Sequence, residues 1–195
     1  MSAVATDHQD HVPEPNVTRF LFADPRMAPV WLILRLWLGY EWLVAALGKW
    51  VEGGWVGQGA GGAVQGFAQG AIAQTAGEHA QVTGWYASFL ENVVLPNAAL
   101  FSYLVILGET LVGMALVLGA FTGIAAFFGV FMNASFLFAG TAGANPLMAL
   151  VAILLVLAWR VAGRWGLDRW ILPAVGVPGA AGNLFGGRGR GAGKR

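Results

Sequence analysis

Four blocks of apolar residues, each about as long as a bilayer is thick, constrain this chain more than any other feature. They occupy residues 29–51, 98–118, 121–140 and 146–162. A helix needs about 20 mostly apolar residues to cross the hydrocarbon core. The blocks therefore predict an all-α integral membrane protein, a bundle of four transmembrane helices. A soluble helix bundle is disfavoured because only residues 141–145 separate the third block from the fourth.

The distribution of basic residues predicts that both termini lie in the cytoplasm. No lysine or arginine occurs between Lys49 and Arg160, whereas Arg19 and Arg26 precede the first block and six basic residues follow Arg160. The loops rich in lysine and arginine stay inside. Two cytoplasmic termini require an even number of spans, in agreement with the four blocks. We therefore expect a multi-pass protein of a prokaryotic inner (plasma) membrane, in contact with lipid.

This topology divides the chain into three parts. Residues 1–28 form a cytoplasmic N-terminal segment, residues 29–173 the four-helix membrane domain, and residues 174–195 a flexible basic cytoplasmic tail. The connection 52–97 faces outward as an external loop, and its glycine-rich first part is expected to be flexible. In residues 84–95, Trp85, Phe89 and Val93 recur every four positions. This spacing predicts an outer amphipathic helix on the bilayer surface.

Composition excludes several kinds of chemistry. The chain has no cysteine, and none of its three histidines lies in an apolar block. We therefore expect no iron–sulfur cluster, no haem and no metal site. The net charge of +1 at pH 7 is too small for a nucleic-acid-binding surface.

Several charged or polar residues interrupt the apolar blocks, at a cost of roughly 2.5–3.5 kcal/mol for each charge at mid-bilayer. Arg35, Glu41 and Lys49 lie in the first block, Glu109 in the second and Asn133 in the third. Counted from the cytoplasmic helix ends at about 1.5 Å per residue, Glu109 lies at a depth between Arg35 and Glu41. If the first two helices are neighbours, this depth predicts an Arg35–Glu109 pair.

Two interpretations of these residues are open. In the structural one, they only fix the packing of the helices. In the functional one, they line a polar pocket for a quinone, whose carbonyls need donors and whose reduction needs protons. Donors would come from Arg35, Lys49 and Asn133, and Trp42 would form a wall. Glu41 and Glu109 would be the catalytic proton relays.

Three stretches resemble the DoxX/DoxD family of small four-helix membrane proteins. They are Arg35-Leu-Trp-Leu-Gly-Tyr-Glu-Trp42 with Gly48-Lys49; Leu95-Pro-Asn97 with Gly108-Glu109 and Gly113; and Met132-Asn133 with Asn145-Pro146, Arg160-Val-Ala-Gly163 and Gly166-Leu-Asp-Arg169. The resemblance covers about residues 29–173 and implies a four-helix membrane fold. In one branch it implies the large subunit of a thiosulfate:quinone oxidoreductase, and in others a membrane partner in redox or stress complexes.

The leading hypothesis is a membrane subunit of a redox complex that passes electrons to membrane quinone, with thiosulfate as the implied donor. The alternative is a non-catalytic anchor or assembly subunit of a larger respiratory or redox complex. Solute transport is disfavoured because four spans leave little room. Thiosulfate is a dianion, and the outward connection has no lysine or arginine. A second protein subunit is therefore expected, with a homo-oligomer as the other possibility.

Overall fold

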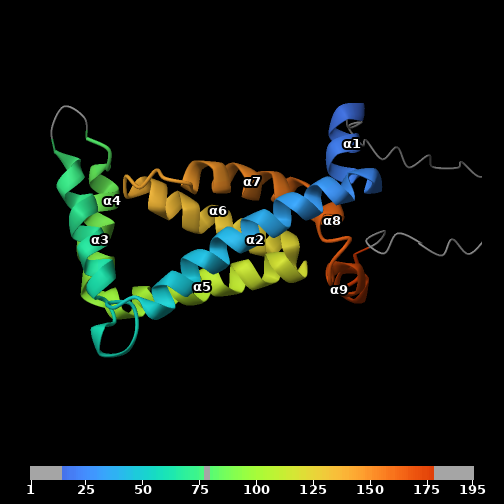
Figure 1. Ribbon diagram of the computed structural model, residues 1–195. Helices are drawn as coiled ribbons and strands as arrows, with labels where there is room; N and C mark the ends of the chain where they lie inside the picture. Colours follow the sequence, from blue (N-terminus) through green and yellow to red (C-terminus); the bar gives the residue numbers. More distant parts are fainter. Residues whose placement is uncertain (1–14, 77–79, 178–195) are drawn as a thin grey trace, which may run out of the picture.

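The protein is described by a computed structural model over residues 15–76 and 80–177, and these residues form helices and connecting turns without a strand. The predicted all-α class is confirmed. Four helices run side by side as a bundle (Figure 1): α2 (Ala28–Val51), α5 (Ala98–Leu118), α6 (Thr122–Phe138) and α7 (Asn145–Leu157). Residues 1–14 and 178–195, which include half of the predicted N-terminal segment and most of the basic tail, lie outside the described residues.

The bundle helices coincide closely with the predicted blocks, except the fourth. That block is divided at Ala158 into α7 and the short helix α8 (Trp159–Ala162). Two helical stretches, Pro25–Val51 and Gly84–Leu118, are long and apolar enough to cross a membrane, whereas α6 and α7 are apolar but shorter. The structure thus contains two candidate spans by length, and crossing by all four helices stays a prediction.

Short helices cover the two ends of the bundle. At one end, α3 (Gly62–Ile72) and α4 (Gly84–Phe89) run across the bundle axis. At the other end lie α1 (Asn16–Ala23), α8 and α9 (Asp168–Ala174) (Figure 1). Residues 15 and 177 are therefore at the same end of the bundle, which is the arrangement that an even number of spans requires. The side of the membrane on which they lie stays a prediction.

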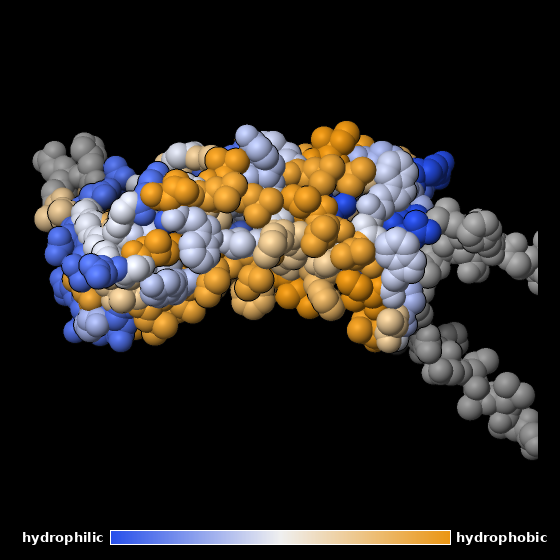
Figure 2. All heavy atoms as spheres, turned by 60° about the horizontal axis from the view of Figure 1, so that its bottom comes forward, coloured by the Kyte–Doolittle hydropathy of each residue, from blue (hydrophilic) through white to orange (hydrophobic). Residues whose placement is uncertain are grey.

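The surface of the bundle is suited to lipid. Figure 2 shows hydrophobic residues over the middle of the molecule and hydrophilic residues gathered mainly at its ends. Large apolar side chains point outward from each bundle helix, including Ile33, Leu104, Phe131 and Leu150. A soluble monomer rarely exposes so continuous an apolar surface. The bundle is therefore embedded in the membrane through this surface.

The connection 52–97 is more ordered than predicted. Its glycine-rich part, some of which was expected to be flexible, contains the helix α3 over residues 62–72. Gly66 and Gly70 lie on the exposed side of α3, while Val64, Ala68 and Ala71 are buried on the other. This buried face belongs to a small second core that includes residues of α4. Three apolar positions were enough to anchor the helix despite its glycines.

The predicted amphipathic helix at 84–95 is helical, but it is not separate from the second bundle helix. After α4 the chain continues through a π-turn (Leu90–Val94) and a 3₁₀ turn (Leu95–Asn97) directly into α5. Tyr86, Leu90 and Val94 are buried in the second core. Trp85 and Val93, in contrast, are exposed. The helix therefore has two apolar faces, and only one of them is free for membrane or partner.

Helices α2 and α5 approach each other closely at two glycines. A Cβ atom on Gly39 would lie 2.9 Å from Val117 Cγ2, and one on Gly113 would lie 2.8 Å from Leu43 Cγ. Small residues at such crossings let helix backbones approach in membranes. These contacts set the register of the antiparallel pair, with Gly39 level with residues 113–117 of α5.

We expect Gly113→Ala to destabilise the protein by about 1–3 kcal/mol, because the added methyl group overpacks the contact with Leu43. Gly66→Ala is the matched control, since nothing lies within 4 Å of a Cβ atom at Gly66. Because alanine favours a helix over glycine, this control is expected to leave the stability unchanged or raise it by up to about 1 kcal/mol. Thermal unfolding in detergent micelles, followed by circular dichroism, measures both. Equal stability of the two variants would contradict the assigned register.

Candidate functional site

A buried ion pair joins the last turn of α2 to the middle of α5. Lys49 Nζ lies 2.9 Å from Glu109 Oε1. The Glu109 side chain is 2% exposed and that of Lys49 is 19% exposed. Lys49 Nζ also lies 5.2 Å from the ring centroid of Trp55, which belongs to the connection at the α3–α4 end. Lys49 therefore links a carboxylate in the bundle interior to the end of the bundle that carries α3 and α4.

Several polar atoms in the interior have no hydrogen-bond partner among the described residues. Four of them are Glu109 Oε2, Trp42 Nε1 and both side-chain polar atoms of Asn133, and the other two, Arg35 Nε and Thr122 Oγ1, lie by the turn between α5 and α6. A buried polar group left unpaired costs about 1–3 kcal/mol. Four such atoms on three neighbouring helices are typical of a site that is completed by a ligand or water.

Contacts between the helices bring these residues to one region of the bundle. Gly108 of α5 packs against Met132 of α6, which places the adjacent residues Glu109 and Asn133 at the same level. One turn before Asn133 on α6, Gly129 packs against the Trp42 indole. We call Trp42, Lys49, Glu109 and Asn133 the interior cluster. Sequence analysis selected all four; the Lys49–Glu109 ion pair is the direct contact among them in the described residues, and their role as a site stays a prediction.

Arg35 lies elsewhere, and the expected Arg35–Glu109 pair is wrong. The buried guanidinium donates hydrogen bonds to the carbonyl oxygens of Leu116, Val117 and Trp165, the last two at 3.1 and 3.5 Å. The depth estimate assumed that the two helices end at the same level. The close approach at Gly39 instead places the end of α5 opposite the middle of α2. Arg35 therefore lies beside the last turn of α5, and Lys49 takes its expected place beside Glu109.

Sequence analysis missed a second buried charge, Asp168. Its carboxylate accepts hydrogen bonds from the backbone N–H groups of Phe121, at 2.5 Å, and Thr122, at 2.9 Å. Asp168 thus caps the N-terminus of α6, where Phe121 has a φ of 48° and supplies no side-chain cap. Its only signal in the sequence was its place in the Gly166–Arg169 motif. An acidic residue that follows a glycine beyond the last apolar block is a candidate to cap the N-terminus of another helix.

Arg35 and Asp168 together hold the short turn between α5 and α6, and we call them the hairpin clamp. The cation lies at the C-terminus of α5 and the anion at the N-terminus of α6, which are the ends where each sign of charge is stabilised. Backbone bonds from Leu167 N to Leu118 O and from Asp168 N to Gly119 O complete the contact, at 3.0 and 2.7 Å. The clamp fixes the structure of the turn, and it occupies the two terminal nitrogens of Arg35, which was expected to donate to a quinone.

Glu41 is not part of either group. Its side chain is half-buried, and no hydrogen bond or ion pair within residues 15–76 and 80–177 involves it. At 100° per residue, Glu41 stands about 80° from Lys49 around α2. The structure therefore does not bring the two predicted proton relays, Glu41 and Glu109, to one face.

The described residues also hold no group of three or more His, Asp or Glu side chains that is placed to bind a metal ion.

The family model of DoxX matches residues 30–142. No curated protein and no solved structure matches the chain. The matched segment includes the whole interior cluster and Arg35, whereas Asp168 lies beyond it. It covers more than half of the chain and confirms the resemblance in the sequence. The protein therefore belongs to the DoxX family of membrane proteins.

Proposed function

We propose that the protein is the membrane subunit of a redox complex and that its interior cluster receives the head group of a membrane quinone. The observation that carries this proposal is the set of buried, unpaired polar atoms on Trp42, Glu109 and Asn133. Two of them, Trp42 Nε1 and Asn133 Nδ2, are donors of the kind that quinone carbonyls accept. Apolar side chains of the bundle surround them, as a lipophilic ring requires.

Each residue of the cluster has a distinct role in this proposal. Trp42 and Asn133 orient the ring by donating to its oxygens. Glu109 transfers protons to the reduced ring, and Lys49 holds Glu109 in place and connects it to the outer end. Reduction of one quinone to quinol takes up two electrons and two protons. Arg35 is left out because both of its terminal nitrogens bind carbonyl oxygens at the end of α5 and near α9, away from the cluster, and Glu41 has no step because it lies off the cluster.

The electrons are proposed to come from thiosulfate through a second subunit. Two thiosulfate ions give up two electrons and form one tetrathionate ion, which balances the reduction of one quinone. The chain between Lys49 and Arg160 has no lysine or arginine, so the second subunit must bind the dianion. This scheme uses four spans with both termini in the cytoplasm of a prokaryotic cell.

The alternative function is a non-catalytic anchor for a larger respiratory or redox complex. The exposed side chains of Trp85, Phe89 and Val93 favour it, because they offer a docking face at the outer end. In this case the interior cluster would serve helix packing alone.

Glu109→Gln separates the two functions. Quinone reduction with thiosulfate, assayed with the protein and its copurifying partner in proteoliposomes, is expected to fall by about 10²–10⁴-fold, because an amide cannot transfer the proton. Glu91→Gln, an exposed acid in the π-turn, is the matched control and is expected to keep the wild-type rate. An unchanged rate in Glu109→Gln would remove the interior cluster from the reaction. A partner that copurifies with a protein devoid of quinone would favour the anchor.

A further inference from the structure

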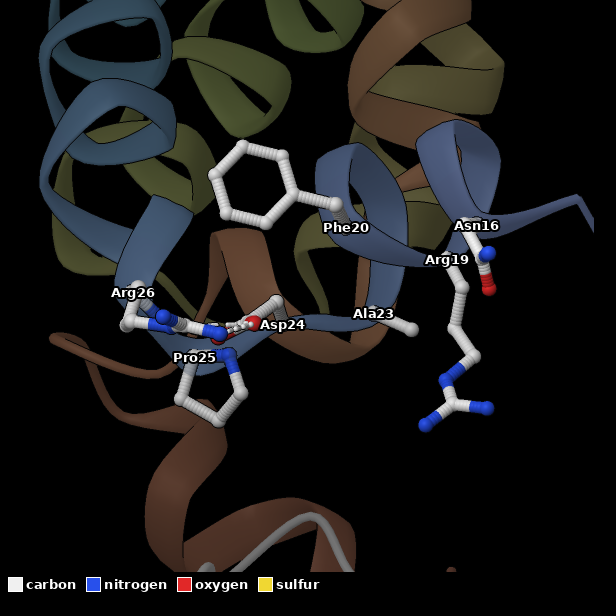
Figure 3. Close-up of a pocket in the computed structure, with 7 residues that line it drawn as sticks. All are labelled: Asn16, Arg19, Phe20, Ala23, Asp24, Pro25 and Arg26. Carbon is white, nitrogen blue, oxygen red and sulfur yellow. Dashed lines mark hydrogen bonds and ion pairs between the residues drawn. The ribbon is translucent and has the colours of Figure 1, made fainter.

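A pocket of about 520 Å³ lies at the end of the bundle opposite α3 and α4, beside α1 and the 3₁₀ turn η1 (Pro25–Met27). Charged and apolar side chains line it together (Figure 3). They include Arg19, Phe20, Ala23, Asp24, Pro25 and Arg26. It uses none of the residues of the interior cluster. The quinone proposal therefore does not account for it.

The pocket is positioned where lipid head groups meet acyl chains. Helix α1 runs across the bundle axis where α2 begins (Figure 1). Trp31 holds it there, because its Nε1 donates to Leu21 O at 2.8 Å and its ring stacks on Phe22 at 5.7 Å. No residue of α1 is buried, and Val17 and Phe20 are 70% and 43% exposed. A short amphipathic helix at this place lies in the interfacial plane of a bilayer.

The charges of the pocket suit a phosphate group. Arg19 forms no hydrogen bond or ion pair within the described residues, and in Figure 3 it lies on the other side of Ala23 from Arg26. Arg26 uses Nε and one terminal nitrogen to bind Asp24, and its side chain is 81% exposed, so its other terminal nitrogen remains available. Arg19 can therefore pair with phosphate oxygens through two parallel bonds, and Arg26 offers one further donor.

Asp24 limits the positive charge of the pocket. The side-chain and backbone hydrogen bonds from Arg26 lower the pKa of Asp24, so its carboxylate stays ionised at neutral pH. Two arginines and one aspartate give the pocket a net charge of +1, which attracts an anion. Asp24 nevertheless occupies part of the Arg26 guanidinium. This makes Asp24 a point at which the affinity of the pocket can be raised as well as lowered.

We propose that this pocket binds the phosphate-bearing head group of an anionic phospholipid from the adjoining leaflet. The guanidinium groups of Arg19 and Arg26 bind the phosphate, and Phe20, Ala23 and Pro25 contact the first carbons of the lipid. A free anion would gain little from two solvent-exposed arginines. A lipid adds apolar contacts and is present at high local concentration beside α1. This lipid-binding proposal requires only that the bundle is embedded in the membrane. It does not depend on the proposed quinone chemistry.

The test uses the full chain in nanodiscs of phosphatidylcholine with a minor fraction of phosphatidylglycerol, followed by native mass spectrometry of the released protein. The wild type is expected to retain phosphatidylglycerol in preference to phosphatidylcholine. Arg19→Ala and Arg26→Ala should each lower this retention roughly fivefold, which corresponds to about 1 kcal/mol per basic residue near an anionic surface. Arg169→Ala, an exposed arginine at the same end of the bundle, is the matched control and should retain the lipid as the wild type does.

Asp24→Asn provides a test of opposite sign. Asparagine can still cap the 3₁₀ turn, as the Asp24 carboxylate does by accepting from Arg26 N at 2.9 Å. Loss of the negative charge frees Arg26, so retention of phosphatidylglycerol should rise severalfold. The proposal is overturned if Arg19→Ala and Arg26→Ala retain the lipid unchanged, or if Arg169→Ala loses as much as they do. Release of the lipid by added inorganic phosphate would also overturn it, since the site would then bind free anions.

Discussion

Replacing Lys49 with methionine is expected to destabilise the folded protein by about 3–5 kcal/mol, because the substitution leaves the Glu109 carboxylate buried without its partner. The side chain of Glu109 is 2% exposed, and one of its oxygens already lacks a hydrogen bond. Methionine keeps much of the volume of lysine, so loss of packing adds little. Unfolding of the full chain in mixed micelles with increasing dodecyl sulfate measures the change.

A double-mutant cycle separates the ion pair from other effects of the substitution. Lys49→Met combined with Glu109→Gln removes both charges, and it is expected to recover most of the stability lost in Lys49→Met alone. Lys49→Met thus changes stability strongly only when Glu109 is present. Additive losses in the double variant would show that the two side chains do not interact in the membrane.

Replacing Arg35 with methionine is expected to have an effect of similar size, about 3–5 kcal/mol, through a different cause. The guanidinium binds three backbone carbonyl groups at the end of α5 and near α9, and it lies 1% exposed among them. Without it, these carbonyls lose their donors, and the buried Asp168 loses the positive charge nearby. Thermal unfolding in detergent micelles measures this loss.

Arg35→Lys distinguishes the clamp from a ligand site. Lysine keeps the positive charge but lacks the planar fork that reaches several carbonyls at once. The lysine variant should therefore regain only part of the stability lost in Arg35→Met, and quinone affinity in the stable fraction should stay at the wild-type value. A specific loss of quinone affinity at unchanged stability would place Arg35 in the binding site after all.

The bundle helices could be predicted because their boundaries follow from local composition. The block from Ala98 to Leu118 is mostly apolar, with Glu109 as its one charged residue, and the described helix α5 has the same limits. The break at Ala158 carries no such signal. It lies next to Trp159, whose Cβ atom packs closely on Gly123 of α6. A contact between residues so far apart in the chain forms only in the folded structure. The local sequence pattern therefore does not predict it.

The same distinction explains which site residues were found. Trp42 and Lys49 are seven residues apart and share a face of α2, so helical geometry alone brought them together. The partner of Lys49 depended instead on the register of α2 against α5, which the glycine contacts determine. Asp168 was missed because its partners are backbone amides. Every residue except proline has a backbone N–H group, so the sequence does not show which of them a carboxylate binds.

The cap on α6 has a consequence for biosynthesis. The amide of Thr122 and the carboxylate that it binds are 46 residues apart, and the carboxylate is made last. At about 5–20 residues per second, the ribosome delivers Asp168 several seconds after the start of α6 has entered the translocation machinery. During that interval the nascent hairpin carries an open, positively polarised helix end. The arrival of Asp168 is thus the event that closes it, and a nascent chain arrested before Asp168 would present this end to insertion and quality-control factors.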